Sequence, residues 1–143
     1  MSSLSPKTLL NRLGLRPKKA LGQHFLLHPH QARRIVAALH LTGAETVVEI
    51  GAGLGALTGL LAPAARRVIA LERDPELARF LAEDLLADSP GVEVICQDVL
   101  EFDFPGAARE AGQPLAVVGN LPYQITSPLL FTLIRDVAAI HQA

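Results

Sequence analysis

The chain has 143 residues, of which half are apolar and 19% are charged, and its net charge is −1. This length fits one ordinary domain, and the composition excludes a disordered chain because enough apolar surface is available to form a core. No apolar run approaches the ~20 residues that a bilayer-spanning helix needs. A single cysteine, Cys96, excludes an internal disulfide, and we expect it to be a small buried side chain in a cytoplasmic protein that binds no metal.

Basic residues are concentrated at the N-terminus. Residues 1–40 hold seven Lys or Arg and no Asp or Glu, whereas the remainder holds six basic and fourteen acidic residues. Residues 1–17 read as a basic amphipathic helix and arm, followed by the pair Lys18 and Lys19. A cationic arm of this kind can lie along a nucleic-acid backbone, because neutralised phosphates release counterions. The alternative is a solvated basic face.

The segment 18–26, KKALGQHFL, follows directly. We expect Gln23 and His24 to fold over a ligand while the apolar residues after them, ending at Leu26, anchor the segment in the core. A helix is then predicted from Pro29 to about Leu41, because proline is favoured in the first helical turn and apolar residues recur at helical spacing.

The rest of the chain is organised around residues 46–58, TVVEIGAGLGALT. β-Branched residues predict a strand over 46–50, buried on both faces as in a parallel sheet. The glycines that follow allow a tight turn and a close approach of backbone to a ligand, and a helix is predicted from Ala56. These three glycines are Gly51, Gly53 and Gly55. A strand, a glycine turn and a helix form a nucleotide-type site.

The glycine pattern alone does not identify the nucleotide. Gly51, Gly53 and Ala56 also satisfy the pattern of dinucleotide enzymes. Glu49, however, would place a carboxylate at the rim of the site, where it would repel a pyrophosphate and attract a ligand with an amino group and a sulfonium. Gly55 has no place in the dinucleotide pattern. Together these two residues favour S-adenosylmethionine.

Two further acids are predicted at the carboxyl ends of strands. Glu72 closes a strand over 67–71, at a spacing where an acid accepts hydrogen bonds from ribose hydroxyls. Asp74 is then predicted to cap a helix. Asp98 follows a strand over 92–96, where its carboxylate can accept from the adenine amino group of a cofactor. Open α/β sheets bind ligands at this edge.

The stretch 120–123, NLPY, follows a fourth strand over 115–119. An exocyclic base amine is a poor nucleophile, because its lone pair is delocalised into the ring. The Asn120 side chain and the Leu121 carbonyl can accept its N–H groups and direct the lone pair towards an electrophile. The ring of Tyr123 offers a face on which a flipped base can stack. These three residues are the predicted catalytic residues.

The last predicted helix begins at Pro128, is capped by Ser127 and runs to Ile140. It is too apolar all round to be a free surface helix. The four strands predict a doubly wound parallel sheet in the order 3-2-1-4.

The motifs GQHFL, EIGAGLGALT, the strand ending in Glu72, QDVL and GNLPY occur in this order, and over about residues 15–135 the chain resembles the KsgA-type ribosomal RNA adenine dimethyltransferases. The resemblance implies a Rossmann-like class I methyltransferase fold and S-adenosylmethionine as cofactor. It also implies dimethylation of adenine N6 in small-subunit (16S) ribosomal RNA during ribosome biogenesis, with the immature small subunit as partner. Cofactor contacts are implied at His24, Leu26, Gly51, Gly53, Glu72, Asp98 and Asn120, and contacts to the target adenine at Asn120 and Tyr123.

The sequence departs from the family at two points. The first motif more often reads GQNFL, so His24 replaces an amide. Family members also continue through three further strands and a helical C-terminal domain, so we expect 18–143 to be the N-terminal portion of the methyltransferase domain, ending after the fourth strand. Two alternatives remain open: a cofactor- or RNA-binding module without catalysis, and a nucleotide-dependent dehydrogenase, which Glu49 and residues 120–123 disfavour.

Overall fold

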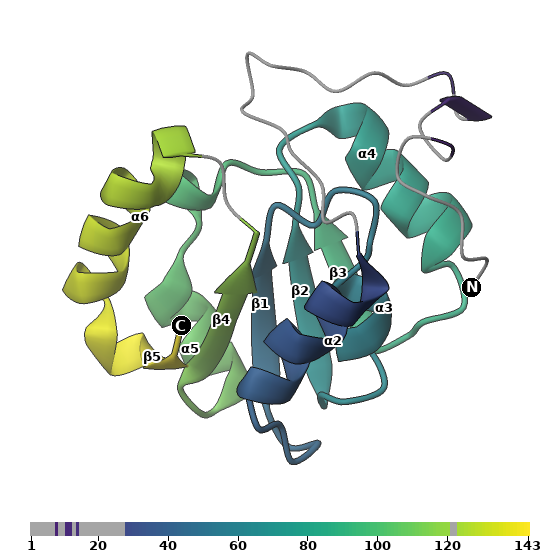
Figure 1. Ribbon diagram of the computed structural model, residues 1–143. Coiled ribbons are helices and arrows are strands. Elements are labelled where there is room, and N and C mark those ends of the chain that lie inside the picture. The colour runs from purple at the N-terminus through teal and green to yellow at the C-terminus, as the bar shows by residue number, and fades with distance from the viewer. Residues whose placement is uncertain (1–7, 9–10, 13, 15–27, 121–122) are drawn as a thin grey trace.

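The structure is a computed structural model that describes residues 8, 11–12, 14, 28–120 and 123–143, with 123–125 described by their backbone alone. Its described strands form one parallel sheet in the order β3-β2-β1-β4-β5, with helices on both faces (Figure 1). The strands are β1 (Thr46–Ile50), β2 (Arg67–Leu71), β3 (Val92–Ile95), β4 (Leu115–Gly119) and β5 (Ile140–Gln142). The α-helices are α2 (Pro29–Ala38), α3 (Thr58–Leu61), α4 (Pro75–Phe80), α5 (Phe104–Ala111) and α6 (Tyr123–Arg135). A π-helix, η2 (Leu81–Leu85), continues α4, and two 3-10 turns are η3 (Val99–Glu101) and η4 (Val137–Ala139).

The prediction of the first four strands is confirmed. β1, β2 and β4 have the predicted bounds, and β3 ends at Ile95, one residue earlier than predicted. β1 lies in the middle of the sheet, parallel to β2 and β4, and all five of its residues are buried. A strand buried on both faces reads as a continuous apolar run rather than as an alternating one, and the β-branched residues of 46–50 fit this position.

Each face of the sheet has its own apolar core. On one face, strand residues such as Val47 and Val68 pack with α2 and α3 residues that include Ala32 and Leu61. On the other, strand residues pack with Phe104 of α5 and with apolar residues of α6 and η4. Because the strands of this sheet are parallel, their carboxyl ends all reach the same edge.

The beginning of the last helix differs from the prediction. α6 begins at Tyr123, so Ser127 is not its cap and Pro128 lies inside the helix. Inside a helix, proline removes one hydrogen-bond donor and its ring crowds the preceding turn, although its fixed φ matches the helix. A proline in the sequence therefore does not by itself mark the first turn of a helix.

The end of the last helix differs as well. α6 ends at Arg135, and after η4 the chain forms a short strand, β5, that pairs in parallel with β4 through Leu115 and Ile140. The Gln142 side chain donates to the Leu39 carbonyl at 2.7 Å and so joins β5 to the end of α2. The prediction that the sheet ends at the fourth strand was therefore wrong, although the order 3-2-1-4 is confirmed.

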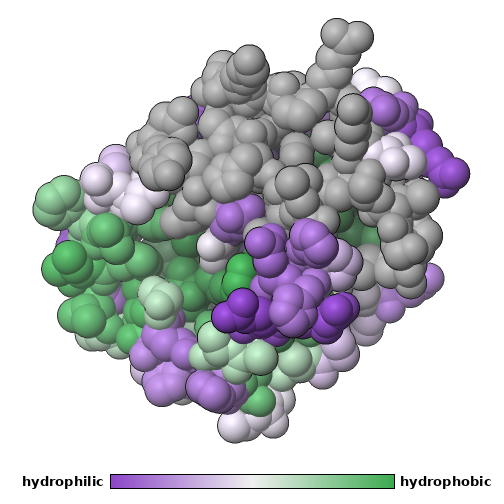
Figure 2. Space-filling model, viewed as in Figure 1, coloured by the Kyte–Doolittle hydropathy of each residue, from purple (hydrophilic) through white to green (hydrophobic). Residues whose placement is uncertain are grey.

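An apolar surface remains uncovered on the outer side of α6 and η4. Leu130, Phe131, Ile134 and Val137 are between 53% and 74% exposed. Figure 2 shows apolar residues gathered over α6, next to the hydrophilic area over α2. Soluble single domains rarely expose a contiguous apolar patch of this kind. We call these four residues the α6 patch.

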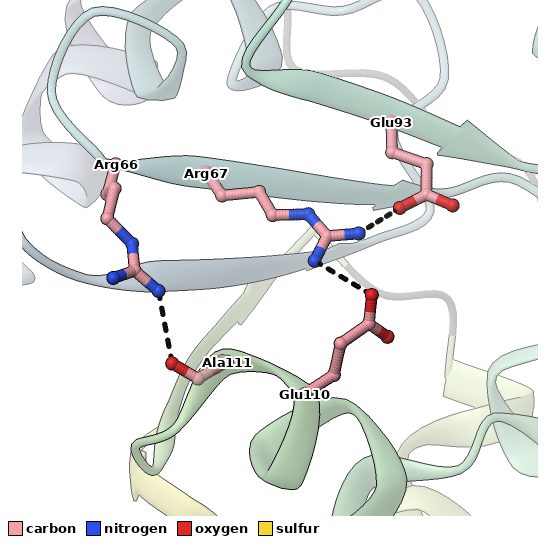
Figure 3. A network of polar contacts seen from close by, with 5 residues as sticks. All are labelled: Arg66, Arg67, Glu93, Glu110 and Ala111. Carbon is pink, nitrogen blue, oxygen red and sulfur yellow. Dashed lines mark hydrogen bonds and ion pairs between the residues drawn. The ribbon is translucent and has the colours of Figure 1, made fainter.

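At the opposite edge of the sheet, where the strands begin, two arginines form polar contacts with β3 and α5 (Figure 3). Arg67, the first residue of β2, forms ion pairs with Glu93 of β3 and, at 3.5 Å, with Glu110 of α5. Arg66 donates to the Ala111 carbonyl at 3.1 Å. These contacts tie α5 to the strands at the edge away from the glycine turn. No described helix is long and apolar enough to cross a membrane.

Candidate functional site

The glycine turn lies at the carboxyl edge of the sheet, between β1 and α3. Gly51, Gly53 and Gly55 all have positive φ, at 68°, 58° and 84°, and L residues with a side chain rarely adopt this conformation. The backbone N–H groups of Gly51 and Ala52 both donate to the Leu71 carbonyl, at 2.9 and 3.0 Å. The turn is thereby attached to the end of the neighbouring strand β2.

Glu72 forms a second attachment between β2 and the turn. Its Oε1 accepts from the Gly53 N–H at 2.8 Å and its Oε2 accepts from the Asp74 N–H at 2.7 Å. Burial raises the pKa of Glu72, while these two backbone N–H groups oppose the shift. The carboxylate predicted to bind a ribose therefore also holds the turn in place. Each oxygen has a second lone pair with which it can accept from a ligand hydroxyl.

Asn120 lies beside the same turn. Gly119 of β4 pairs with Ile50 of β1, so the residues that follow them, Asn120 and Gly51, lie side by side at the carboxyl edge. A Cβ at Gly51 would be 4.0 Å from the backbone carbonyl oxygen of Asn120. Glu72 and Asn120 thus lie on either side of the glycine turn, at one edge of the sheet, as the sequence predicts.

Asp98 lies after β3, at the carboxyl edge, and its side chain is partly buried. Its Oδ1 accepts from the Leu100 N–H at 3.0 Å, which caps η3 and orients the carboxylate. The prediction for Cys96 was wrong, because this residue is exposed. The strand ends at Ile95, and Cys96 therefore falls in the loop that follows it.

Glu49 does not form a charged rim. It is 1% exposed, and its carboxyl accepts a hydrogen bond from the Thr58 hydroxyl. Burial raises the pKa of Glu49 from 4.5 to about 8, and the nearby Glu72 adds to this shift. The group is therefore mostly neutral at pH 7, and the argument that a charge on Glu49 repels a pyrophosphate was wrong. The physical reason is that both faces of β1 are buried.

The helix after the turn is shorter than predicted. α3 begins at Thr58 rather than Ala56 and ends at Leu61. The Glu49–Thr58 hydrogen bond joins its first residue to β1. Sequence reasoning missed this role of Thr58. The signal was available, since a buried carboxyl in β1 requires a hydrogen-bond donor nearby.

Several predicted site residues lie outside the described residues: Lys18, Lys19, His24, Leu26, Leu121 and the side chain of Tyr123. The basic arm predicted over 1–17 also lies almost entirely outside them. Within the described part of the chain, no group of three or more His, Cys, Asp or Glu residues could hold a metal ion.

The described site therefore combines the glycine turn after β1 with side-chain acceptors that follow three other strands of the sheet. Glu72 follows β2, Asp98 follows β3 and Asn120 follows β4, so each acceptor comes from a different strand of one sheet. Such a set can accept hydrogen bonds from hydroxyl and amino groups of a nucleoside while the turn approaches it closely. The site fits an adenosine-bearing cofactor.

The chain is similar in sequence to ribosomal RNA methyltransferases. The ribosomal RNA adenine dimethylase family matches residues 14–143. The ribosomal RNA small subunit methyltransferase A of Acidobacterium capsulatum is 52% identical over 126 residues, which cover 88% of this chain and 44% of that protein. The corresponding protein of Myxococcus xanthus is 42% identical over 140 residues, with 97% and 47% covered. The chain thus spans about half the length of the curated relatives it matches.

Solved structures show the same similarity. The 23S rRNA methyltransferase ErmE has a TM-score of 0.71 and 35% identity, over 80% of this chain and 44% of that one. A dimethyladenosine transferase from Plasmodium falciparum has a TM-score of 0.68 and 31% identity, over 78% and 38%. An RNA methyltransferase from Salinibacter ruber, solved with S-adenosyl-L-homocysteine, shares the fold at a TM-score of 0.64 and 18% identity, over 78% and 70%. This chain belongs to the ribosomal RNA adenine dimethylase family.

Proposed function

We propose that this chain is the N-terminal part of an S-adenosylmethionine-dependent dimethyltransferase that modifies adenine N6 in small-subunit ribosomal RNA. The observation that carries the proposal is the arrangement of the carboxyl edge. Glu72 holds Gly53, and the Asn120 backbone lies beside Gly51, so the two residues proposed to accept from the ribose and from the base flank one glycine turn. Family membership supports the same reaction.

The cofactor is proposed to lie across the glycine turn. Gly51 and Gly53 allow its close approach, Glu72 accepts from the ribose hydroxyls, and Asp98 accepts from the adenine amino group. Asn120 completes the described part of the site, and His24 and Leu26 are proposed to contact the cofactor from the segment before α2. S-adenosylmethionine supplies an electrophilic methyl group.

The chain's own residues are proposed to prepare the adenine. The Asn120 side-chain carbonyl and the Leu121 backbone carbonyl accept the two N–H groups of the amine, which turns the nitrogen lone pair towards the methyl group. The ring of Tyr123 stacks on the flipped base. A nitrogen–carbon bond forms, the carbon–sulfur bond breaks, the thioether leaves without charge, and the amine releases a proton to solvent. A second turnover adds the second methyl group.

The RNA partner is proposed to be small-subunit ribosomal RNA within the immature subunit, in the cytoplasm. Lys18 and Lys19, together with the basic arm over 1–17, carry positive charge suited to a phosphate backbone. The curated relatives are named as small-subunit rRNA methyltransferases, which supports this choice over large-subunit RNA.

The test combines calorimetry with methyl transfer. We expect this chain to bind S-adenosylmethionine with a 1:1 stoichiometry and to transfer methyl groups to adenines of immature small subunits. The variant Asn120→Ala should lower transfer at least ~100-fold, because its amide orients the reacting amine. Binding without transfer would assign the chain to a non-catalytic module. Thermal protection by NAD but not by S-adenosylmethionine would assign it to a dehydrogenase and overturn the proposal.

A further inference from the structure

Gly55, the third glycine of the turn, is packed against the π-helix η2. A Cβ at Gly55 would lie 2.2 Å from Cδ2 of Leu85 and 3.1 Å from Cδ2 of Leu81. The first distance is far below any real carbon contact, so Leu85 occupies the space that a side chain at this position would need. A methyl group at Gly55 would therefore fit only if the end of the Leu85 side chain moved away from the turn.

The two leucines reach the turn from a widened helical segment. The Leu86 N–H donates to the Leu81 carbonyl at 2.8 Å, a hydrogen bond of the π type that continues α4 beyond Phe80. Leu81 is fully buried in a cluster with Ala52 of the turn, and Leu85 is partly buried against the same cluster. π-Helical segments are rare and frequently occur at functional sites.

We infer that η2 supports the glycine turn. In this arrangement Leu85 packs on Gly55, and Gly55 is a positioning residue: this packing fixes the position of Gly53 and so of the cofactor site. The inference rests on the proposed function. It explains why the third position of the turn is a glycine, which the dinucleotide pattern does not require. Gly55 acts through packing and touches neither cofactor nor base in this account. Gly53 lies two residues before Gly55 in the same turn, and its N–H donates to Glu72. A shift of the turn at Gly55 would therefore also move the hydrogen bond to Glu72.

Positive φ alone is the competing explanation for this glycine. Gly55 has a φ of 84°, so any other residue there is strained whatever the packing. Gly112, at the end of α5, provides a matched control. Its φ is 72°, and a Cβ there would meet nothing within 4 Å. The variants Gly55→Ala and Gly112→Ala therefore share the backbone strain and differ in the contact with Leu85.

The experiment compares Gly55→Ala, Leu85→Ala, the double variant and Gly112→Ala. Hydrogen exchange at the Gly53 amide, measured without ligand, reports local opening of the turn. Calorimetry with S-adenosylmethionine, at a temperature where all variants are folded, reports the dissociation constant Kd. Melting temperatures are recorded for each variant.

We expect Gly55→Ala to speed exchange at Gly53 and to weaken Kd, each about tenfold or more. Gly112→Ala should lower the melting temperature through backbone strain alone and leave both readouts within about twofold. Adding Leu85→Ala to Gly55→Ala should restore most of both losses. The inference is overturned if Gly55→Ala behaves like Gly112→Ala, or if removing Leu85 restores neither readout. A wild-type chain that fails to bind S-adenosylmethionine would overturn the proposed function instead, and the exchange comparison would still decide the role of Gly55.

Discussion

The carboxyl edge of the sheet buries polar side chains, whereas the α6 patch exposes apolar ones. At the edge, polar groups are buried and bonded: Glu49 and Glu72 are at most 5% exposed, and both accept hydrogen bonds. In the patch, apolar groups such as Phe131 are exposed without a covering element among the described residues. A buried polar group stabilises the structure through the hydrogen bonds that it makes, whereas an exposed apolar side chain contributes little to the free energy of unfolding.

The largest contrast is expected between two adjacent leucines of α6. Leu129 is 2% exposed and belongs to the core under the sheet, whereas Leu130 is 53% exposed. Leu129→Ala should lower the free energy of unfolding by about 2–5 kcal/mol, because it removes buried surface and leaves a cavity. Leu130→Ala should cost less than about 1 kcal/mol. Urea unfolding measures both, and equal losses would show that the patch is buried in solution.

The next effect is expected at Glu72. In Glu72→Ala the buried N–H groups of Gly53 and Asp74 lose their acceptor, and we expect a loss of roughly 2–4 kcal/mol in the free energy of unfolding together with loss of S-adenosylmethionine binding. Asp103→Ala is the matched control, since that carboxylate accepts from a single exposed Gly106 N–H at a helix start. It should cost about 1 kcal/mol and leave binding unchanged. If Glu72→Ala bound S-adenosylmethionine normally, this carboxylate would not be part of the cofactor site.

A pH effect follows from Glu49. Its folded pKa of about 8 lies above the ordinary value of 4.5, so between these values the folded state holds a proton that the unfolded state has lost. The stabilising contribution is complete below about pH 4.5 and is lost as the pH rises towards 8. From pH 6 to 8 the free energy of unfolding should fall by about 2 kcal/mol, and the raised pKa of Glu72 adds in the same direction.

The variant Glu49→Gln isolates this effect. A neutral amide in the same place should flatten the decrease between pH 6 and 8 and should stabilise the chain most at the upper end. Glu45→Gln serves as control, because Glu45 is exposed and hydrogen bonds from Thr42 lower its pKa, which confines its titration to acidic pH. A slope between pH 6 and 8 that survives in Glu49→Gln would show that another group titrates there.

The smallest change in folding stability is expected in the patch. Phe131 and Ile134 are 74% and 69% exposed, so Phe131→Ser and Ile134→Ser should each change the free energy of unfolding by no more than about 0.5 kcal/mol. Both should lower concentration-dependent association, measured by sedimentation velocity, because a contiguous apolar patch promotes contact between molecules. S-adenosylmethionine binding should be unaffected. Unchanged association in both variants would mean that the patch does not cause it.

The sequence predicted best the parts that local pattern determines. Strands β1, β2 and β4 were predicted to the residue, since continuous apolar runs between turn signals leave few alternatives. The placement of Glu72 and Asn120 at one edge also followed, because parallel strands share their carboxyl ends. The prediction failed where tertiary contacts decide.

Three of these failures have physical causes visible in the structure. Glu49 was predicted at a charged rim although its strand was also predicted to be buried on both faces, and this burial is what determines the environment of its carboxyl group. β5 was missed because its three residues carry no strand pattern of their own and form only against β4. The packing of Gly55 on Leu85 joins segments far apart in the chain, which no local motif encodes.

The most direct test of the site is a titration of the isotope-labelled chain with S-adenosyl-L-homocysteine, followed by amide chemical shifts. The site predicts the largest shifts at Gly51, Gly53, Glu72, Asp98 and Asn120, and none beyond noise at Phe131 or Ile134. Shifts centred on α6, or an unperturbed glycine turn at saturating ligand, would contradict the assignment of the cofactor site to the carboxyl edge of the sheet.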